Sequence, residues 1–223
     1  MSIYPTNDYR NYLEHHGVLG MKWGIQNGPP YPLDRGSVET ESAKDNSWKE
    51  RACNNLLDEL NNRWDYGVLN KGKHILDTED FDWSKYRTTP IETLKKEKCG
   101  VCWDFVNYQH HELKRLGIKD KSYMFVMKKR DDDPDDIVTH TFSMYELGGK
   151  KYWIESSMWP KRGIHEVDSY KDVIEEIKDN YKVKDSDYSL FEYNPEGLDK
   201  GLTSQEYFDA ATQHLVYNHK KKG

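Results

Sequence analysis

The sequence has few cysteines and no long apolar run, and each absence excludes a class of protein. Three cysteines among 223 residues are too few, and odd in number, for a disulfide framework, which favours free thiols in a reducing compartment. No apolar stretch approaches the roughly 20 residues that a membrane-spanning helix needs. The opening residues MSIYPTNDYR lack the apolar core of a secretory signal. We therefore expect no membrane partner and no secretory signal.

Basic residues are also fewer than acidic ones. Lys and Arg number 33 against 39 Asp and Glu, and the formal net charge of −6 argues against a nucleic-acid partner. Hydrophobic residues make up only 35% of the chain, but seven Trp and sixteen Tyr offer large surfaces to bury. The length suits one domain with extensions. We expect a Gly- and Pro-rich arm over residues 1–36, a domain over 37–217 and a basic tail over 218–223.

Capping signals predict the first two helices. Ser47 and Glu50 form a capping box, and apolar residues then recur at every fourth position as far as Trp64. In RTTPIETLKKEK, Thr89 is expected to cap a short helix with Pro90 at its first position. The CGVC sequence follows directly after this helix.

Three further helices and a buried strand are expected downstream. The first helix runs from Cys102 to Leu116, because one face is apolar and Gly117 is a natural stop. The other two helices occupy residues 169–181 and 203–215. Residues 122–129, SYMFVMKK, read as a buried strand. The acidic stretch RDDDPDD reads as a solvated loop, since it lacks the glycine and distant glutamate of a calcium loop.

The segment HTFSMYELGGKKYWIESS predicts a hairpin. Gly148-Gly149 suits a two-residue primed turn, and the strands that flank this turn then pair so that Phe142 faces Glu155. His140 shares that face and lies diagonally across from Glu155, at roughly 7–8 Å along the backbone. A carboxylate beside an imidazole fixes its tautomer, as in the base half of a nucleophilic triad, although a purely structural His–Glu hydrogen bond has the same signature.

The cysteine at the start of the third helix supplies a candidate nucleophile. The positive end of the helix dipole is expected to lower the pKa of the Cys102 thiol. The free amide groups of the first helical turn could also stabilise a tetrahedral oxyanion. One element would then contribute both the nucleophile and part of an oxyanion hole.

The ordered motifs resemble those of a known group of enzymes. GVCWDF before a helix, THTFSMY on one strand and KYWIES on the next resemble the transglutaminase-like group of papain-related cysteine enzymes. TPIETL and RGIHEV resemble a subgroup from tailed phages and Gram-positive bacteria. The resemblance implies an α+β papain/transglutaminase-like fold, with a helix-borne cysteine packed against an antiparallel β-sheet.

The same resemblance assigns roles to three residues. Cys102 would be the catalytic nucleophile, His140 the base and Glu155 the acid that orients His140, where the wider superfamily usually has Asp. It implies acyl transfer or hydrolysis at an amide of a protein or peptide substrate, without a cofactor and without a metal. His165 in RGIHEV is a competing imidazole that we interpret as structural.

The opening arm has a resemblance of its own. HHGVLGMKWG is similar to a short sequence near the ends of phage virion and phage-associated proteins. This likeness implies phage virion proteins as partners of the arm. It also implies a location in the host cytoplasm or in association with the virion.

Three alternatives stay open from the residues alone. Cys99 and Cys102 form a C-x-x-C pair at a helix start, as in thiol–disulfide redox proteins, although such pairs normally follow a strand of a βαβ unit. The same pair could supply two zinc ligands, but no second pair accompanies it. The chain could also be a non-catalytic virion or interaction module.

Overall fold

The computed structural model describes residues 41–76, 78, 81–128, 137–181 and 187–219. The chain divides into two compact units, Met1–Thr40 and Glu41–Gly223, and everything below concerns the second unit. The predicted arm with its HHGVLGMKWG sequence, the acidic stretch RDDDPDD and the last four residues lie outside the described residues. Within the described part, no helix combines the length and apolar character required to cross a bilayer.

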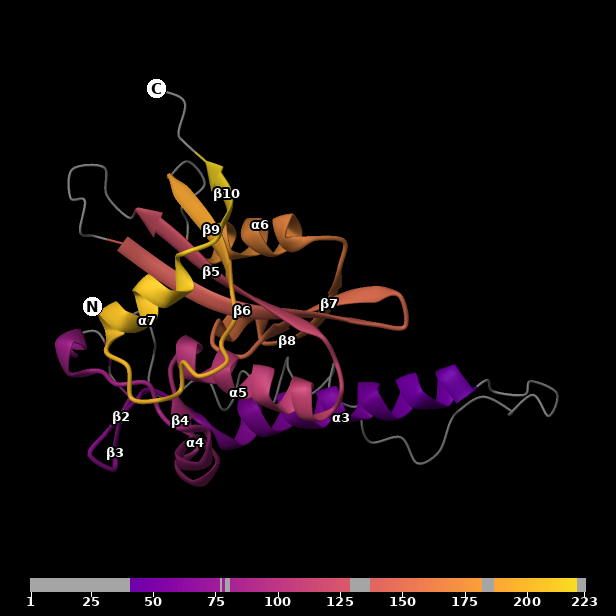
Figure 1. The fold of residues 1–223 in the computed structure, drawn as a ribbon, viewed down its shortest axis with the longest axis horizontal. Coiled ribbons are helices and arrows are strands. Elements are labelled where there is room, and N and C mark those ends of the chain that lie inside the picture. The colour runs from indigo at the N-terminus through magenta and orange to yellow at the C-terminus, as the bar shows by residue number, and fades with distance from the viewer. Residues whose placement is uncertain (1–40, 77, 79–80, 129–136, 182–186, 220–223) are drawn as a thin grey trace. The chain divides into compact units, whose positions relative to one another are not determined.

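The second unit is a mixed α+β structure built around one antiparallel sheet (Figure 1). The sheet has six strands in the order β10-β9-β5-β6-β7-β8, and every neighbouring pair is antiparallel. The strands are β5 (Asp120–Lys128), β6 (Ile137–Leu147), β7 (Lys150–Glu155), β8 (Gly163–Val167), β9 (Tyr188–Tyr193) and β10 (Leu215–His219). The predicted α+β class and antiparallel sheet are therefore confirmed.

Five helices are found among the described residues, together with small strands beside the sheet. The helices are α3 (Glu41–Arg63), α4 (Ile91–Glu97), α5 (Cys102–Arg115), α6 (Tyr170–Tyr181) and α7 (Ser204–Ala211). Short 3-10 turns are η2 (Trp83–Lys85) and η3 (Trp159–Lys161). The small strands are β1 (Asp65–Tyr66), β2 (Val68–Asn70), β3 (Lys73–Ile75) and β4 (Cys99–Gly100), with β1 parallel to β4.

The two faces of the sheet are covered by different helices. Odd residues of β5 and even residues of β6, such as Phe125 and Phe142, pack with Ile177 and other apolar residues of α6. Even residues of β5 and odd residues of β6, such as Met124 and Tyr145, pack on the side of α5. Figure 1 shows α6 and α5 on opposite sides of the strands. This alternation decides which side chains can meet Cys102.

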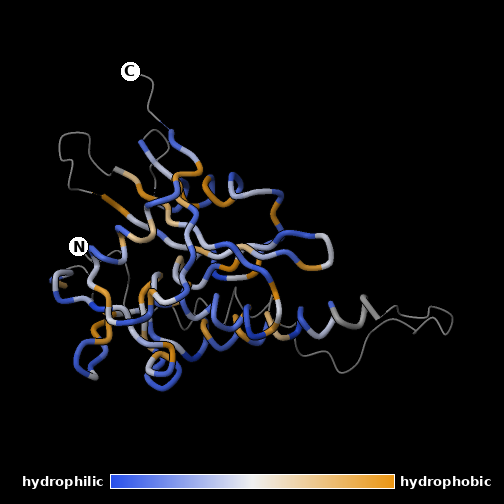
Figure 2. The backbone as a smooth tube through the Cα atoms, viewed as in Figure 1, coloured by the Kyte–Doolittle hydropathy of each residue, from blue (hydrophilic) through white to orange (hydrophobic). Residues whose placement is uncertain are grey.

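The long helix α3 lies outside this sandwich and is only partly apolar. Hydrophilic residues dominate it in Figure 2, but Leu56, Leu60 and Trp64 are buried against Phe105 and its neighbours. The predicted start at Ser47 was wrong, because the helix begins at Glu41 and the Ser47 hydroxyl accepts a hydrogen bond from Arg51 within it.

The bounds of the other predicted helices agree with the structure to within one residue, apart from the end of α7. In α4, Pro90 occupies the capping position and Thr89 does not cap, so the predicted start was wrong by one residue. For α5, the predicted start at Cys102 is confirmed, and Gly117 beyond its end has a φ of 67° that favours glycine. At α7 the capping box of Thr203 and Glu206 is present, but the helix ends at Ala211 rather than continuing to residue 215.

The hairpin has the predicted register. Gly148 and Gly149 have φ values of 62° and 79°, and the recorded pairs run from Leu147 with Lys150 to Ser143 with Ile154. Such positive φ values are those of a primed two-residue turn. Strand β10 includes residues 218 and 219, which were predicted to belong to the basic tail.

Candidate active site

The chain presents Cys102 at the start of α5 through a short extended segment. Lys98 ends α4 in the left-handed region, with a φ of 51°, and β4 then pairs with β1. Val101 is extended, with φ of −96° and ψ of 179°, and caps α5 without a side-chain acceptor. The carboxylate of Asp104 accepts a hydrogen bond from the Val101 amide at 3.2 Å instead. Asp104, a residue of α5 itself, therefore fixes the geometry of the junction that precedes the Cys102 thiol.

Cys102 is a buried, neutral thiol in this structure. Its side chain is 8% exposed, and burial raises its pKa to about 11. Interactions with Thr141 lower this pKa, and the nearby carboxylates of Glu155 and Asp104 raise it. The Thr141 hydroxyl approaches the thiol but forms no hydrogen bond of normal geometry. The expected lowering of the pKa was wrong, because burial outweighs whatever the helix terminus contributes.

His140 and Glu155 form a buried hydrogen-bonded pair. His140 Nε2 lies 2.7 Å from Glu155 Oε2, and the two side chains are 2% and 1% exposed. The other carboxylate oxygen, Oε1, accepts hydrogen bonds from the Ser157 and Met158 amides at 2.7 and 2.8 Å. Burial acts to raise the pKa of Glu155, but the charge and hydrogen bond of His140 and these two amides lower it overall. The predicted diagonal contact is confirmed.

This pairing fixes the chemical character of the imidazole. A carboxylate accepts hydrogen bonds and does not donate them, so Nε2 of His140 carries a proton. In the neutral ring, Nδ1 is then the basic nitrogen. The ring also lies 6.4 Å from Phe142 and 6.2 Å from Tyr181, measured between centroids. His140 is thus an oriented base on the face of the sheet that α6 covers.

Cys102 approaches the same stretch of β6 from the other face. It belongs to the core cluster of Met124 on the α5 side and interacts with Thr141, the residue next to His140. No hydrogen bond joins the Cys102 thiol to His140. Pairing of β6 with β7 is recorded only from Ser143 onward, so among the described residues the 137–142 part of β6 has a partner strand on one side alone. The Cys102 thiol and the His140 imidazole therefore lie on opposite faces of β6, beside the part of this strand for which no pairing with β7 is found in the described part of the chain.

The first turn of α5 has amide groups available beside the thiol. The amide of Phe105 donates to the Val101 carbonyl at 3.0 Å and that of Val101 donates to Asp104. Among the described residues, the amides of Cys102 and Trp103 donate to no neighbouring segment. Donors of this kind, at a helix N-terminus, are suited to bind a developing negative charge.

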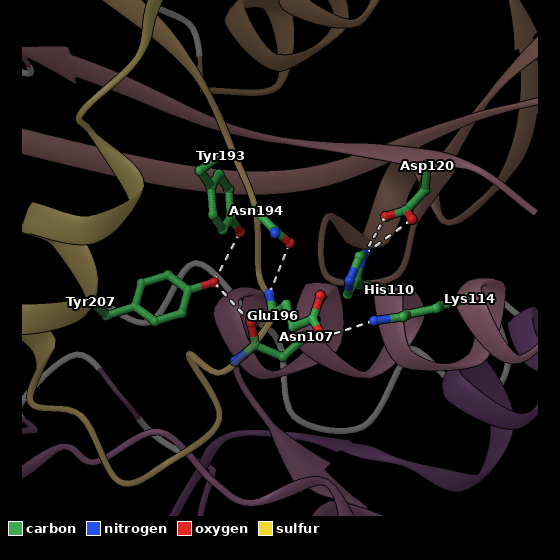
Figure 3. Close-up of polar contacts among 8 residues, drawn as sticks. All are labelled: Asn107, His110, Lys114, Asp120, Tyr193, Asn194, Glu196 and Tyr207. Atoms are coloured by element: carbon green, nitrogen blue, oxygen red, sulfur yellow. Dashed lines mark hydrogen bonds and ion pairs between the residues drawn. The ribbon is translucent and has the colours of Figure 1, made fainter.

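The helix α5 is also tied to the C-terminal part of the chain, as Figure 3 shows. The hydroxyl of Tyr207 on α7 donates to Asn107 Oδ1 at 3.2 Å and lies 2.9 Å from the hydroxyl of Tyr193 on β9. Nearby, His110 Nδ1 lies 3.0 Å from both carboxylate oxygens of Asp120. These contacts hold α5 between the sheet and α7.

Aromatic rings continue this packing around the start of α5. The rings of Trp103 and Tyr207 stack with centroids 4.8 Å apart, and the ring of Tyr86 meets Trp103 edge-on at 5.5 Å. Trp83 lies 5.7 Å from Tyr86 and is 39% exposed. Trp103 is a core residue, 7% exposed. The contributions of Tyr193 and Tyr207 were missed, since nothing in the local sequence signals a contact over 100 positions.

The other cysteines and the competing imidazole lie apart from this arrangement. All three cysteines are free and buried, and burial raises the pKa of Cys99 to about 12 and also raises that of Cys53. His165 donates from Nε2 to the Lys161 carbonyl at 2.7 Å and packs on Trp153. It lines a cavity of about 520 Å³ near β8 and α6, and neither Cys102 nor His140 lines that cavity. The described residues contain no group of three or more His, Cys, Asp or Glu side chains suited to hold a metal ion.

Comparison with known proteins gives one short match. Residues 6–25 match the model of a family described as "Family of unknown function (DUF7211)". This segment contains the HHGVLGMKWG sequence and lies outside the described residues. No curated protein matches the chain. The site must therefore be interpreted from its own chemistry.

Proposed function

We propose that this protein is a papain-related, transglutaminase-like cysteine enzyme that transfers or hydrolyses acyl groups at amide bonds. Cys102 is the nucleophile, His140 the general base and Glu155 the residue that orients His140. The observation that carries the proposal is the buried pair of His140 on β6 and Glu155 on β7, because Thr141, the residue next to His140, interacts with the thiol. The order of the motifs, from GVCWDF to THTFSMY to KYWIES, supports the same assignment.

The chemistry follows from these groups. As the sulfur of Cys102 attacks the carbonyl carbon of an amide, the thiol proton passes to Nδ1 of His140. The carbonyl oxygen becomes an oxyanion beside the amides of the first turn of α5. The C–N bond then breaks, the leaving amine takes the proton from His140, and a thioester remains. Water releases a carboxylate from this thioester, whereas an amine releases a new amide.

The resting thiol is consistent with a general-base mechanism. A pKa of about 11 leaves almost all of the Cys102 sulfur protonated at neutral pH, so the proton must leave during attack rather than before it. His140 can receive that proton only if its ring and the thiol, which lie on opposite faces of β6 in this structure, come together when substrate binds. Catalytic hydrogen bonds that are absent in a free enzyme commonly form once substrate is bound.

Acylation by 4-nitrophenyl acetate tests the proposal without knowledge of the natural substrate. We expect a burst of nitrophenolate and an acetyl group on Cys102 in the mass of the intact protein. Cys102→Ala should abolish both. Cys53→Ala serves as the matched control, since Cys53 is also a buried free thiol but lies in another core cluster, and it should leave both unchanged.

The same acylation assay tests the roles of His140 and Glu155. His140→Gln should lower the burst rate by roughly 100- to 10,000-fold, the usual contribution of a general base. Glu155→Gln keeps the shape of the side chain and should lower the rate less. A rate in His140→Gln equal to wild type would exclude His140 as the base. Rapid closure of a disulfide between Cys99 and Cys102, with no acylation, would instead support the redox alternative.

The fate of the thioester needs a protein mixture as substrate. After incubation with phage and host proteins, proteome-wide mass spectrometry distinguishes new chain ends, deamidated glutamines and Gln–Lys crosslinks. Each product must disappear with Cys102→Ala to count. Absence of every such product, together with absence of the acetyl burst, would favour a non-catalytic virion or interaction module.

A further inference from the structure

A second buried carboxylate lies within the same helical turn as the nucleophile. Asp104 is 0% exposed, and its two oxygens accept hydrogen bonds from two different segments. Oδ1 accepts from the Thr89 amide at 3.0 Å, and Oδ2 accepts from the Val101 amide at 3.2 Å. We call this pair of bonds the Asp104 bridge. It joins the segment before α4 to the junction between β4 and α5.

The residue at position 100 allows the bridge to form. A Cβ atom added to Gly100 would lie 2.7 Å from the Cβ of Asp104, a distance that real Cβ atoms essentially never show. Any other residue at position 100 would therefore push Asp104 away from the Val101 amide. The glycine two residues before Cys102 has a local structural reason, which is the close approach of Asp104.

The far end of the bridge is itself anchored. Thr88, beside Thr89, donates its amide to the Leu202 carbonyl at 2.8 Å and accepts from the Gly201 amide at 3.1 Å through its own carbonyl. The Thr88 hydroxyl also accepts from the Leu202 amide at 2.9 Å. The Asp104 bridge thus connects the start of α5 to a segment held by the C-terminal part of the chain. Movement of the junction is restrained from both sides.

The charge of Asp104 does not favour ionisation of the Cys102 thiol. Burial raises the pKa of Asp104 to about 6, although the amides of Thr89 and Val101 and the nearby Tyr86 act to lower it. When ionised, Asp104 raises the pKa of Cys102, which opposes formation of a thiolate. The role of Asp104 therefore has to lie in the geometry of its two hydrogen bonds rather than in its charge.

We propose that Asp104 is a positioning residue for acyl transfer, which holds the junction before α5 so that the Cys102 sulfur and the first-turn amides stay aligned on one carbonyl group. This inference rests on the proposed function. Asp104 acts through Val101 and Thr89 and does not touch the reacting atoms. A displacement of about 1 Å at a nucleophile is enough to lower rates by about 100-fold.

Asp104→Asn tests the bridge with the smallest change of shape. An asparagine has one acceptor oxygen, so one of the two amides would face an NH₂ donor and lose its bond. We expect the burst rate with 4-nitrophenyl acetate to fall by roughly 10- to 100-fold. Amide hydrogen exchange at Val101 or Thr89 should accelerate at the same time. The exchange measurement reports on the bridge independently of any activity.

Asp172→Asn is the matched control. Asp172 also accepts from two amides, those of Asp168 and Ser169 at 3.0 and 2.9 Å, at the start of α6 on the other side of the sheet. It should leave the burst rate within about 2-fold of wild type, because it shares the local bonding but not the contact with the Cys102 junction. Circular dichroism confirms that each variant is folded before it is assayed.

Gly100→Ala provides a second variant in case Asp104→Asn does not fold. It keeps the carboxylate but displaces it, and the same loss of burst rate is expected. If wild type forms no acetyl-Cys102, the proposed function fails. If wild type is acetylated and both Asp104→Asn and Gly100→Ala keep its rate, the positioning role alone is overturned. Faster exchange at Val101 with an unchanged burst rate would likewise overturn it.

Discussion

Asp104 and Glu155 are both fully buried carboxylates near the Cys102 thiol, yet their pKa values move in opposite directions. Glu155 has the imidazole of His140 against one oxygen and two backbone amides against the other, and its pKa is lowered. Asp104 accepts from two amides, and its pKa is raised to about 6. At Asp104 the amide hydrogen bonds do not offset burial, whereas at Glu155 two amides together with His140 do.

The largest expected effect comes from removing the paired carboxylate. Glu155→Ala leaves His140 buried without its partner and frees the Ser157 and Met158 amides. We expect a loss of about 3–5 kcal/mol in the free energy of unfolding, measured by urea denaturation. Glu146→Ala, at an exposed position of β6, should cost less than about 0.5 kcal/mol. A loss below 1 kcal/mol in Glu155→Ala would show that the pair is not buried as described.

The pH dependence of the free energy of unfolding reports on the ionisation of Asp104. In the folded protein Asp104 holds its proton up to about pH 6, whereas its ordinary pKa is 3.8. The folded state therefore binds more protons between about pH 4 and pH 6, and stability falls by about 3 kcal/mol as pH rises through that window.

Asp104→Asn should remove this part of the slope. Wild type and variant are compared by urea denaturation at about pH 4, 5, 6 and 7, because the difference between them cancels the other carboxylates. Tyr86, Cys99 and Cys102 face Asp104, but all stay protonated in this range because burial raises their pKa values. If the free energy of unfolding changed with pH in the same way in both proteins, the raised pKa of Asp104 would be contradicted.

Glu155→Gln gives the opposite sign. Because its folded pKa is lowered, the stability that Glu155 contributes is present above its ordinary value of 4.5 and is lost as pH falls through the folded pKa. The variant should be about 1.5–3 kcal/mol less stable at neutral pH, the usual value of a hydrogen bond to a charged group. The gap to wild type should narrow in acid. If the stability difference between wild type and Glu155→Gln widened at acidic pH, the folded pKa of Glu155 would be raised rather than lowered.

The smallest effect concerns the turn that sets the register of the pair. Gly149 has a φ of 79° and open space around it, so Gly149→Ala should cost about 1 kcal/mol of backbone strain. Gly117→Ala, with a φ of 67° and open space beyond α5, is the matched control and should cost the same. If Gly149→Ala lowered the free energy of unfolding as much as Glu155→Ala, the turn alone would determine the register of the hairpin. That result would contradict a register that is also held by the five residue pairs between β6 and β7.

The features that were predictable from sequence depend on neighbours in the chain. The register of the hairpin follows from two glycines, and the His140–Glu155 contact follows from that register by alternation. The span of α5 follows from its apolar face and from Gly117. In each case the residues that determine the structure lie within about one or two elements of one another, so a single sequence contains the necessary signal.

The features that were missed depend on contacts across the chain. Thr89 reads as a helix cap, but its amide is bound by Asp104, fifteen positions later. The dipole argument for a reactive Cys102 neglects burial, which Thr141 and the aromatic residues near α5 produce together. Strands β9 and β10 were not predicted, because their pairing partners lie far away. Local patterns carry no information about such partners.

The hydrogen bonds between Tyr207 and Asn107, and between Thr88 and Leu202, have a consequence for how the protein is made. They join α5 and the segment before α4 to residues that a ribosome adds about a hundred positions later. Until residues 202–207 emerge, the helix that bears the thiol lacks these supports and the segment beneath Asp104 is unanchored. A chain interrupted before residue 202 would thus carry Cys102 on a helix that lacks these supports, and the segment around Cys102 would become ordered well after Cys102 itself has been synthesised.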